Sequence, residues 1–444
     1  MRTLDRLLKP ITHIIHNSLT RPSADGSRAV PSGISDRLFN GQHKLPRDHS
    51  IRTPRAGTAR SRGRVVNRRL LVLCAIILLP LLAACTRNIG NESDGWNPPV
   101  SSDGVVYIGT KDGEVQALID DGSGNLQLSW TFPAASSENN LIGVYNTPLV
   151  VGDLVYVSGI DGYLYALNKE NGFLTDGGWR RPQGQFEEPE RLVAGPAYDP
   201  ENDIILAPSE DGFLYAYTAK NGNQFWNPFQ TGAAIWSTPA VDNGIAYFGS
   251  HDHKVYAVTL DDGQELWSYE TGGVVAGRPL VFDGKVIAGS FDKKLYALSA
   301  KDGTVLWTFE GEKWFWAGAV TDGKTIFAPN MDGNIYALDL NGNLLWKHNV
   351  GSAIVSPPVL VSRGLVVAAK DGDLLLLDTN PAISGLGRVL FNQKIGDAEI
   401  KAPLFADGDS VYVGSQDRTV RRIEFKSGQR NVWCVDTREG GCNN

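Results

Sequence analysis

The chain has 444 residues, with 42 Lys and Arg against 49 Asp and Glu, and a formal net charge of −7. The charge is divided unevenly, because residues 1–84 hold 15 Lys and Arg against four Asp, a net of +11, which leaves −18 for residues 85–444. An acidic main part excludes a nucleic-acid binder whose folded region supplies the positive charge, and four cysteines are too few for a scaffold built from disulfides.

An apolar run at residues 70–84 (LLVLCAIILLPLLAA) follows Arg68-Arg69 and ends directly before Cys85. It is short for a membrane span and has the length of a signal-peptide core. Its end, Leu-Ala-Ala-Cys, resembles the bacterial lipobox, which implies cleavage before Cys85 and lipidation of that cysteine. We therefore interpret residues 65–84 as a lipoprotein signal peptide and residues 85–96 as a tether. An ordinary cleaved signal, or a short anchor that retains both Cys74 and Cys85, is the alternative.

The first 64 residues do not fit a signal peptide, which begins only a few residues before its apolar core. They are rich in Arg, Ser, Gly and Pro without an apolar period, and this composition is typical of disorder. One interpretation is a mis-assigned start, with translation beginning at Val65 or Val66. The other is a basic cytoplasmic tail on an uncleaved anchor.

Eight segments of the remaining chain share a pattern in which an aspartate precedes an alternating run such as Leu-Tyr-Ala-Leu. These aspartates follow one another at spacings of 39 to 50 residues: Asp112, Asp161, Asp211, Asp252, Asp292, Asp332, Asp371 and Asp417. Hairpin turns of Asp-Gly or Asn-Gly divide each copy into four short runs of period 2, which predicts four antiparallel strands. A four-stranded unit of about 40 residues is typical of a propeller blade. The sequence predicts an all-β, monomeric, eight-bladed β-propeller at residues 97–435 and a tail at 436–444.

The last strand of each copy is expected to carry a large aromatic residue. It is Phe391 in the seventh copy and a tryptophan in the other copies: Trp130, Trp179, Trp226, Trp267, Trp307, Trp346 and Trp433. Segments such as residues 297–307 (ALSAKDGTVLW) resemble the tryptophan-docking motif of the pyrroloquinoline quinone (PQQ) repeat family. The resemblance implies that each tryptophan packs between neighbouring blades, so we expect a structural role for this set.

Two cysteines lie near the C-terminus, Cys434 on the last expected strand and Cys442 on the tail beyond it. In an exported protein we expect them to form a disulfide; two free thiols on a frayed terminus are the alternative. The pattern does not decide whether the ring closes by packing alone or by a strand from residues 89–96.

Residues that lead into the first strand of each blade are expected to line one mouth of a central channel. Four aromatic residues and two cations stand there: Trp96, Tyr145, Trp236, Trp316, Arg278 and Lys401. Aromatic walls with a few polar groups suit a ligand or a peptide, so we predict a binding funnel. The alternative is that these side chains only fill the channel mouth.

The PQQ repeat also builds quinoprotein dehydrogenases, so a PQQ-dependent enzyme is an alternative function. Those enzymes resemble one another in adjacent cysteines, a calcium site and a longer chain, and this chain has neither a Cys-Cys pair nor a Cys-x-x-Cys-His haem site. A metal site at His251 and His253 would need further ligands, and His348 is the only other histidine after residue 85. We therefore interpret the two histidines as part of a hairpin turn. We predict no catalytic residues, no metal and no cofactor.

An exported, lipid-anchored chain with eight such blades resembles the BamB family of the outer-membrane β-barrel assembly machinery. The resemblance implies a non-catalytic scaffold that binds proteins, with a β-barrel assembly channel as its partner and no nucleic acid. It implies a lipid anchor at the outer membrane facing the periplasm, or at the outer face of the cytoplasmic membrane. The charged segment at residues 175–191, expected as an insertion between blades 2 and 3, departs from this pattern. A generic cell-surface propeller that binds a ligand is the alternative.

Overall fold

The computed structural model describes residues 96–121, 126–133, 141–174, 178–182, 190–380, 385–426, 430–440 and 442. They belong to one compact unit that spans residues 91–444. Over these ranges, no helix has the length and apolar character needed to cross a membrane.

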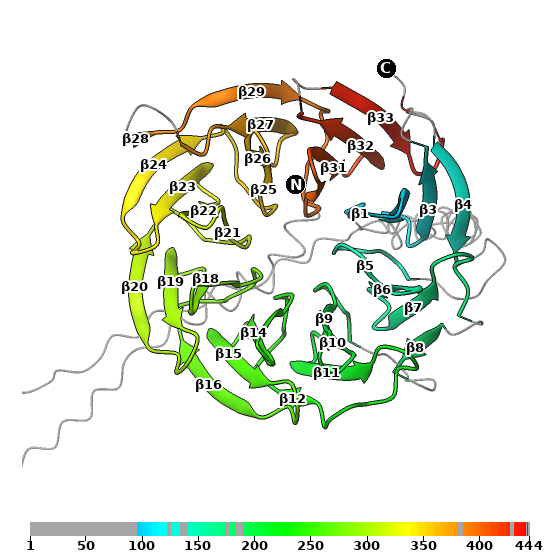
Figure 1. Cartoon of the computed structure of the whole chain (residues 1–444), viewed down its shortest axis with the longest axis horizontal. Helices are drawn as coiled ribbons and strands as arrows, with labels where there is room; N and C mark the ends of the chain where they lie inside the picture. Colours follow the sequence, from blue (N-terminus) through cyan, green and yellow to red (C-terminus); the bar gives the residue numbers. More distant parts are fainter. Residues whose placement is uncertain are drawn as a thin grey trace, which may run out of the picture. The chain divides into compact units, whose positions relative to one another are not determined.

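Eight antiparallel sheets form a ring in which the first strand of each sheet lies innermost and the last lies outermost (Figure 1). Blades 1 to 4 contain β1 (Pro99–Ser102), β2 (Val105–Gly109), β3 (Val115–Asp120), β4 (Leu126–Phe132); β5 (Leu149–Val151), β6 (Leu154–Ser158), β7 (Leu164–Asn168), β8 (Trp179–Arg181); β9 (Ala197–Asp199), β10 (Ile204–Pro208), β11 (Phe213–Thr218), β12 (Phe229–Gln230); and β13 (Ala240–Asp242), β14 (Ile245–Gly249), β15 (Lys254–Thr259), β16 (Glu265–Glu270). Blades 5 to 8 contain β17 (Leu280–Phe282), β18 (Lys285–Gly289), β19 (Lys294–Ser299), β20 (Val305–Glu310); β21 (Val320–Thr321), β22 (Thr325–Pro329), β23 (Asn334–Asp339), β24 (Leu344–Asn349); β25 (Val359–Val361), β26 (Gly364–Ala368), β27 (Asp373–Leu377), β29 (Val389–Lys394); and β30 (Phe405–Asp407), β31 (Ser410–Gly414), β32 (Thr419–Glu424), β33 (Arg430–Asp436). The predicted eight-bladed β-propeller is confirmed.

In blades 2, 3, 4, 5, 6 and 8 the repeated aspartate holds the turn between the second and third strands, because it accepts a hydrogen bond from the backbone N two residues later. In blade 4, Asp252 accepts hydrogen bonds from the backbone N of Lys254 at 3.1 Å and from the hydroxyl of Tyr256 at 2.6 Å. The residue after the aspartate has a positive φ, which explains why glycine is common there. His253 takes this conformation in blade 4 with φ 73°. The aspartates of these six blades are therefore occupied in folding the turns.

Three details differ from the expected strands. Trp226 lies in the loop before β12 rather than in the strand, because β12 holds only two residues. The segment expected as an insertion contains β8, the outer strand of blade 2. A fifth strand, β28 (Gly385–Leu386), adds to the outer edge of β24 in parallel.

Each docking tryptophan contacts the blade that follows it. Trp130, Trp179, Trp226, Trp267 and Trp307 each donate a hydrogen bond from Nε1 to a backbone carbonyl of the next blade, at 2.8–3.2 Å. A glycine of that blade lies over each indole; at Gly303, for example, φ is 72° and an added Cβ would approach the ring of Trp267 to 2.7 Å. The blades are thus locked in pairs by an indole that fills the wedge between two sheets.

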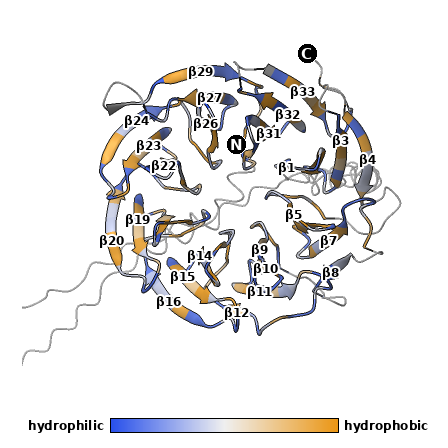
Figure 2. Ribbon diagram, viewed as in Figure 1, coloured by the Kyte–Doolittle hydropathy of each residue, from blue (hydrophilic) through white to orange (hydrophobic). Residues whose placement is uncertain are grey.

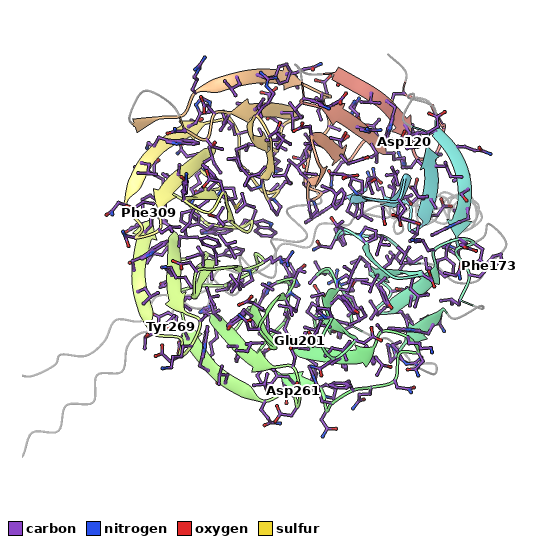
Figure 3. The ribbon with its side chains drawn as sticks, in the orientation of Figure 1. Asp120, Phe173, Glu201, Asp261, Tyr269 and Phe309 are labelled. Carbon is purple, nitrogen blue, oxygen red and sulfur yellow. A yellow bond between two sulfur atoms is a disulfide. The ribbon has the colours of Figure 1, made fainter. Side chains whose placement is uncertain are left out.

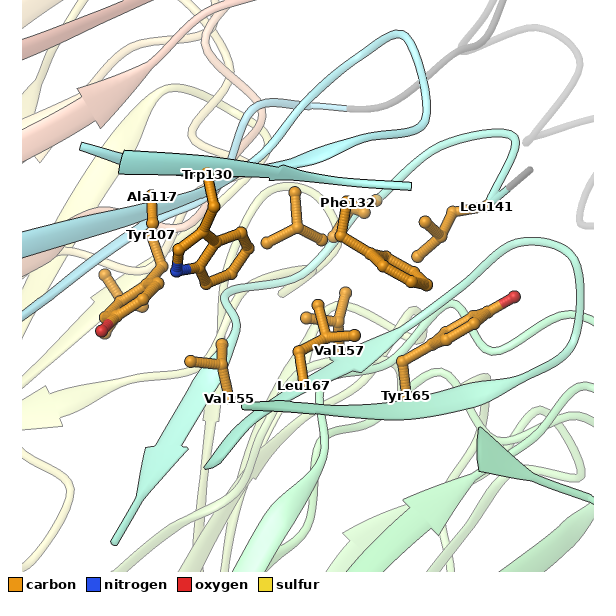
Figure 4. Packing of buried hydrophobic residues seen from close by; sticks show 12 residues of the cluster. Tyr107, Ala117, Trp130, Phe132, Leu141, Val155, Val157, Tyr165 and Leu167 are labelled. Carbon is orange, nitrogen blue, oxygen red and sulfur yellow. The ribbon is translucent and has the colours of Figure 1, made fainter. Parts of the chain in front are cut away.

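Hydrophobic residues fill the middle strands of the blades (Figure 2), and β10 and β26 are buried at every position, because each sheet is covered on both faces by its neighbours. The core is divided into clusters that each join two neighbouring blades. One of them joins blade 1 to blade 2 through Trp130, Phe132, Val155 and Tyr165 (Figure 4). Stability is therefore built up from one blade-to-blade contact after another around the ring.

The ring closes by side-chain contacts between blades 1 and 8, and blade 8 is built in order from β30, β31, β32 and β33. Arg422 forms an ion pair with Asp120 at 2.7 Å, and Arg418 forms one with Asp112 at 2.9 Å. Figure 3 shows Asp120 at the boundary between the first and last blades. In the structure Cys434 of β33 is bonded to Cys442, with 5.6 Å between their Cα atoms, and this disulfide ties the tail to the last strand. Cys85 and the segment expected as a tether, apart from Trp96, lie outside the described residues.

Candidate functional site

One face of the ring carries the turns between the second and third strands of the blades, together with the segments that pass from one blade to the next. We call it the turn face. Backbone hydrogen bonds join the two: the N of His251 donates to the O of Ala234 at 2.9 Å, and the N of Met331 donates to the O of Trp314 at 3.0 Å. In both cases the donor residue stands directly before the repeated aspartate. The residues at this place form the turn column, which comprises Lys111, Ile160, Glu210, His251, Phe291, Met331, Lys370 and Gln416.

The turn column meets the predicted funnel residues at blades 3 to 6. The ring of Trp236 lies 4.3 Å from that of His251 and 6.3 Å from that of Trp316, measured between centroids. Phe291 stacks between two tryptophans, at 5.3 Å from Trp316 and 4.8 Å from Trp314. We call Trp236, Phe291, Trp314 and Trp316 the aromatic cluster. Its three tryptophans are half-buried, so each presents part of its ring to solvent.

The remaining funnel residues fall into separate places. Trp96 and Tyr145 pack edge to face at 4.9 Å, and Tyr145 is buried. Arg278 is exposed, and the protein around it lowers the pKa of its guanidinium through desolvation. Within the described part of the chain, no ring contact joins the pair of Trp96 and Tyr145 to the aromatic cluster.

Lys401 is not a cation exposed to a ligand, which corrects its place in the predicted funnel. Its side chain is 1% exposed, and Nζ lies 2.6 Å from Glu399, which also pairs with Lys370 at 3.1 Å. Burial by itself would raise the pKa of Glu399, but the two ammonium groups outweigh it and hold that pKa below its ordinary value. Lys401 is therefore a buried cation that neutralises the partly exposed carboxylate of Glu399.

Two titratable groups of the turn column lie against Trp236. Glu210 accepts hydrogen bonds from Nε1 of Trp236 at 2.9 Å and from Nε of Arg191 at 2.8 Å. Burial nevertheless raises the pKa of Glu210. Burial, aided by neighbouring His253, lowers the pKa of His251 to about 4 against the opposing effect of Asp252, so His251 is neutral at pH 7. This end of the turn face thus joins a largely buried acid, a neutral imidazole and partly exposed indoles.

The chemistry of this arrangement suits binding. The partly exposed indoles supply apolar contact area and Arg278 supplies an exposed cation, and these are the residue types that dominate the energy of protein interfaces. In the described part of the chain, no group of three or more His, Cys, Asp or Glu side chains is placed to hold a metal ion.

Sequence reasoning missed most of the turn column and two members of the aromatic cluster, Phe291 and Trp314. The turn column has no constant residue type, so composition and periodicity do not reveal it. Its signal is positional, because every member precedes a repeated aspartate. Trp314 stands two residues before the aromatic position that defined the funnel, and only its stacking on Phe291 connects it to the cluster.

The family model described as outer membrane protein assembly factor BamB matches residues 86–235, 210–354 and 331–443. The protein of that name from Yersinia pestis is 31% identical over 179 residues, covering 38% of this chain and 42% of the relative. The Escherichia coli K12 protein of that name is 26% identical over 172 residues, covering 38% of this chain and 41% of the relative, so less than half of either relative is spanned.

The crystal structure of BamB from Moraxella catarrhalis superposes with a TM-score of 0.60 at 17% identity, covering 77% of this chain and 97% of that chain. At that identity the likeness shows the fold alone. The family model reaches from before the first blade to the C-terminal tail, well over half of the chain. By that match, this chain belongs to the family of the outer membrane protein assembly factor BamB.

Proposed function

We propose that this protein is a lipid-anchored, non-catalytic scaffold that binds a β-barrel assembly channel during outer-membrane protein assembly. The observation that carries the proposal is the match of the BamB family model along residues 86–443. The relatives it resembles carry that assembly role in their names. The anchor is the lipid expected on Cys85, which places the propeller at the outer membrane facing the periplasm or at the outer face of the cytoplasmic membrane.

The aromatic cluster and Arg278 are the proposed contact surface. Half-buried tryptophans lose little conformational entropy on binding, and their rings supply a large contact area. The acidic propeller also favours a protein partner over nucleic acid or anionic lipid. Six of the repeated aspartates hold turns, as Asp252 does, which supports a non-catalytic role because these carboxylates already accept hydrogen bonds within the fold.

Affinity capture from detergent-solubilised envelopes of the host tests the proposal. The tagged chain is expected to recover the β-barrel assembly channel, and the double variant W314A/W316A is expected to recover much less of it. Lys324→Glu is the matched control, because Lys324 is exposed in the turn between β21 and β22, on the opposite face of the ring. Failure of the unmodified chain to enrich the channel over an unrelated lipoprotein would contradict the proposal.

A further inference from the structure

The crevices between neighbouring blades share a position in the outer strand. It is the residue paired with the third residue after the repeated aspartate, as Tyr269 of β16 pairs with Val255 of β15. We call it the crevice position. In chain order it is occupied by Phe132, Arg181, Phe229, Tyr269, Phe309, His348, Gln393 and Val435.

In four crevices an aromatic ring at this position packs against a tyrosine of the next blade. The centroids are 5.4 Å apart for Phe132 and Tyr165, 5.6 Å for Phe229 and Tyr256, 5.7 Å for Tyr269 and Tyr296, and 5.1 Å for Phe309 and Tyr336. Figure 4 shows Phe132 facing Tyr165, and Figure 3 places Tyr269 and Phe309 towards the outside of the ring. The hydroxyl of the tyrosine in the next blade also donates a hydrogen bond to the repeated aspartate four residues earlier.

The crevice between blades 2 and 3 keeps the tyrosine and lacks the ring. Tyr215 donates to Asp211 at 2.6 Å, as its equivalents do. The crevice position is Arg181, which ends the three-residue strand β8 directly before Pro182. The guanidinium of Arg181 donates to the backbone carbonyls of Asn221 and Gly222, so its polar end is held by the turn of the next blade.

A cavity of about 630 Å³ lies at this crevice, lined by Leu164, Arg181, Leu192, Asp211, Tyr215 and Tyr217 among other residues. This volume lies within the range of roughly 300–1,000 Å³ that is typical of ligand sites. Leu164 and Leu192 are buried and apolar, and Tyr215 stacks on Tyr217 with only 5° between the rings. None of the aromatic cluster lines the cavity, so the site is separate from the proposed contact surface of the turn face.

We propose that this crevice binds an aromatic side chain, Tyr or Phe, carried by an extended segment of a partner polypeptide. The model for this contact comes from the propeller itself. In four other crevices, a β-strand presents such a ring to the equivalent tyrosine. The cavity is larger than one ring, which leaves room for backbone on either side. Glu190 in the lining suits a partner segment with a donor group next to the ring.

Fluorescence anisotropy with the full chain tests the site. The probe is a fluorescein-labelled peptide, Ser-Thr-Val-Tyr-Val-Thr-Ser, and its counterpart carries Ala in place of Tyr. The Tyr peptide is expected to bind saturably and the Ala peptide at least about tenfold more weakly. Equal affinity for the two peptides would overturn the proposal.

Variants of the chain locate the binding. Arg181→Phe supplies the missing ring and is expected to abolish binding, whereas Tyr215→Leu is expected to weaken it roughly threefold to tenfold. Tyr256→Leu is the matched control, because its crevice already holds Phe229, and it should leave the affinity unchanged. Unchanged binding by Tyr215→Leu would overturn the proposal even if Arg181→Phe failed to fold.

The chain itself offers a competing ring, since Phe186 lies between Pro182 and Glu190, outside the described residues. The variant Phe186→Ala is therefore measured with the same peptides. If the site serves a partner, the unmodified chain and Phe186→Ala bind the Tyr peptide alike. Binding by Phe186→Ala alone would replace the proposal with occupation of the crevice by the chain's own ring.

Discussion

The indole Nε1 of Trp433 donates a hydrogen bond to the carboxylate of Asp120 over 2.9 Å, and this bond joins the last blade to the first. Five other docking tryptophans donate to a backbone carbonyl of the following blade. At the closure a carboxylate takes that place and also pairs with Arg422 at 2.7 Å. The tryptophan at the ring closure thus donates to a charged carboxylate, whereas the five others donate to neutral backbone carbonyls.

Replacing Asp120 with Ala is expected to lower the free energy of unfolding by about 2–3 kcal/mol, because it leaves the Trp433 indole and the Arg422 guanidinium without their acceptor. Asp120→Asn keeps an acceptor and should cost less. Urea unfolding followed by far-UV circular dichroism measures both. Asp103→Ala is the control, since its pair with Lys169 is on the surface and its loss should change little. Equal effects of the two alanine variants would contradict this account of closure.

Substituting a docking tryptophan should mainly lower the stability of the fold, whereas substituting a tryptophan of the aromatic cluster should mainly weaken binding. Trp267→Ala is expected to cost about 3–5 kcal/mol, because it empties the wedge between blades 4 and 5. Trp316→Ala removes a half-buried ring and should cost about 1–2 kcal/mol. Thermal unfolding measures stability, and capture of the assembly channel measures binding. A folded Trp316→Ala with full capture would remove this residue from the contact surface.

The sequence was sufficient to predict the ring because each blade repeats the same features in the same order. Each blade has one repeated aspartate, which gives the number of blades, and a tryptophan near the outer strand of most copies indicates where a blade ends. The binding surface was less predictable. Lys401 stood in the expected column, yet its side chain is buried and pairs with Glu399, a contact that spacing alone does not reveal. The cavity beside Tyr215 became visible only through strand register, because the spacing from the repeated aspartate to the crevice position varies from 16 residues at His348 to 22 residues at Gln393.

The stability of the propeller is expected to depend on pH through His251. Its pKa is about 4 in the folded chain against an ordinary value of 6.5, so between these values the unfolded chain binds the proton more readily. Stability from this group is fully present above about pH 6.5 and falls by about 3 kcal/mol as pH drops towards 4.

Urea unfolding at several pH values compares the chain with His251→Phe, a substitution suggested by blade 5, where Phe291 holds the same position. The comparison must be a difference between the two proteins, because burial raises the pKa of Asp161 to about 6 and this carboxyl acts in the opposite direction. The difference in unfolding free energy should grow as pH falls from 6.5 to 4. A difference that is constant with pH would show that the pKa of His251 is the same in the folded and the unfolded chain, and would contradict this prediction.

We predict that Cys85 is lipidated, because the proposed scaffold works only if it is held at a membrane. The envelope-derived protein is expected to begin at Cys85 and to carry the mass of a lipid modification, since the apolar run before it has the length of a signal core. Intact-mass spectrometry and N-terminal peptide mapping measure this directly. Cys85→Ser should abolish the modification and release the propeller from the membrane fraction while leaving its urea unfolding unchanged, because the folded blades begin after this residue. A mass that includes residues 1–64 would instead favour a basic tail on an uncleaved anchor, and the propeller would then be tethered by protein rather than by lipid.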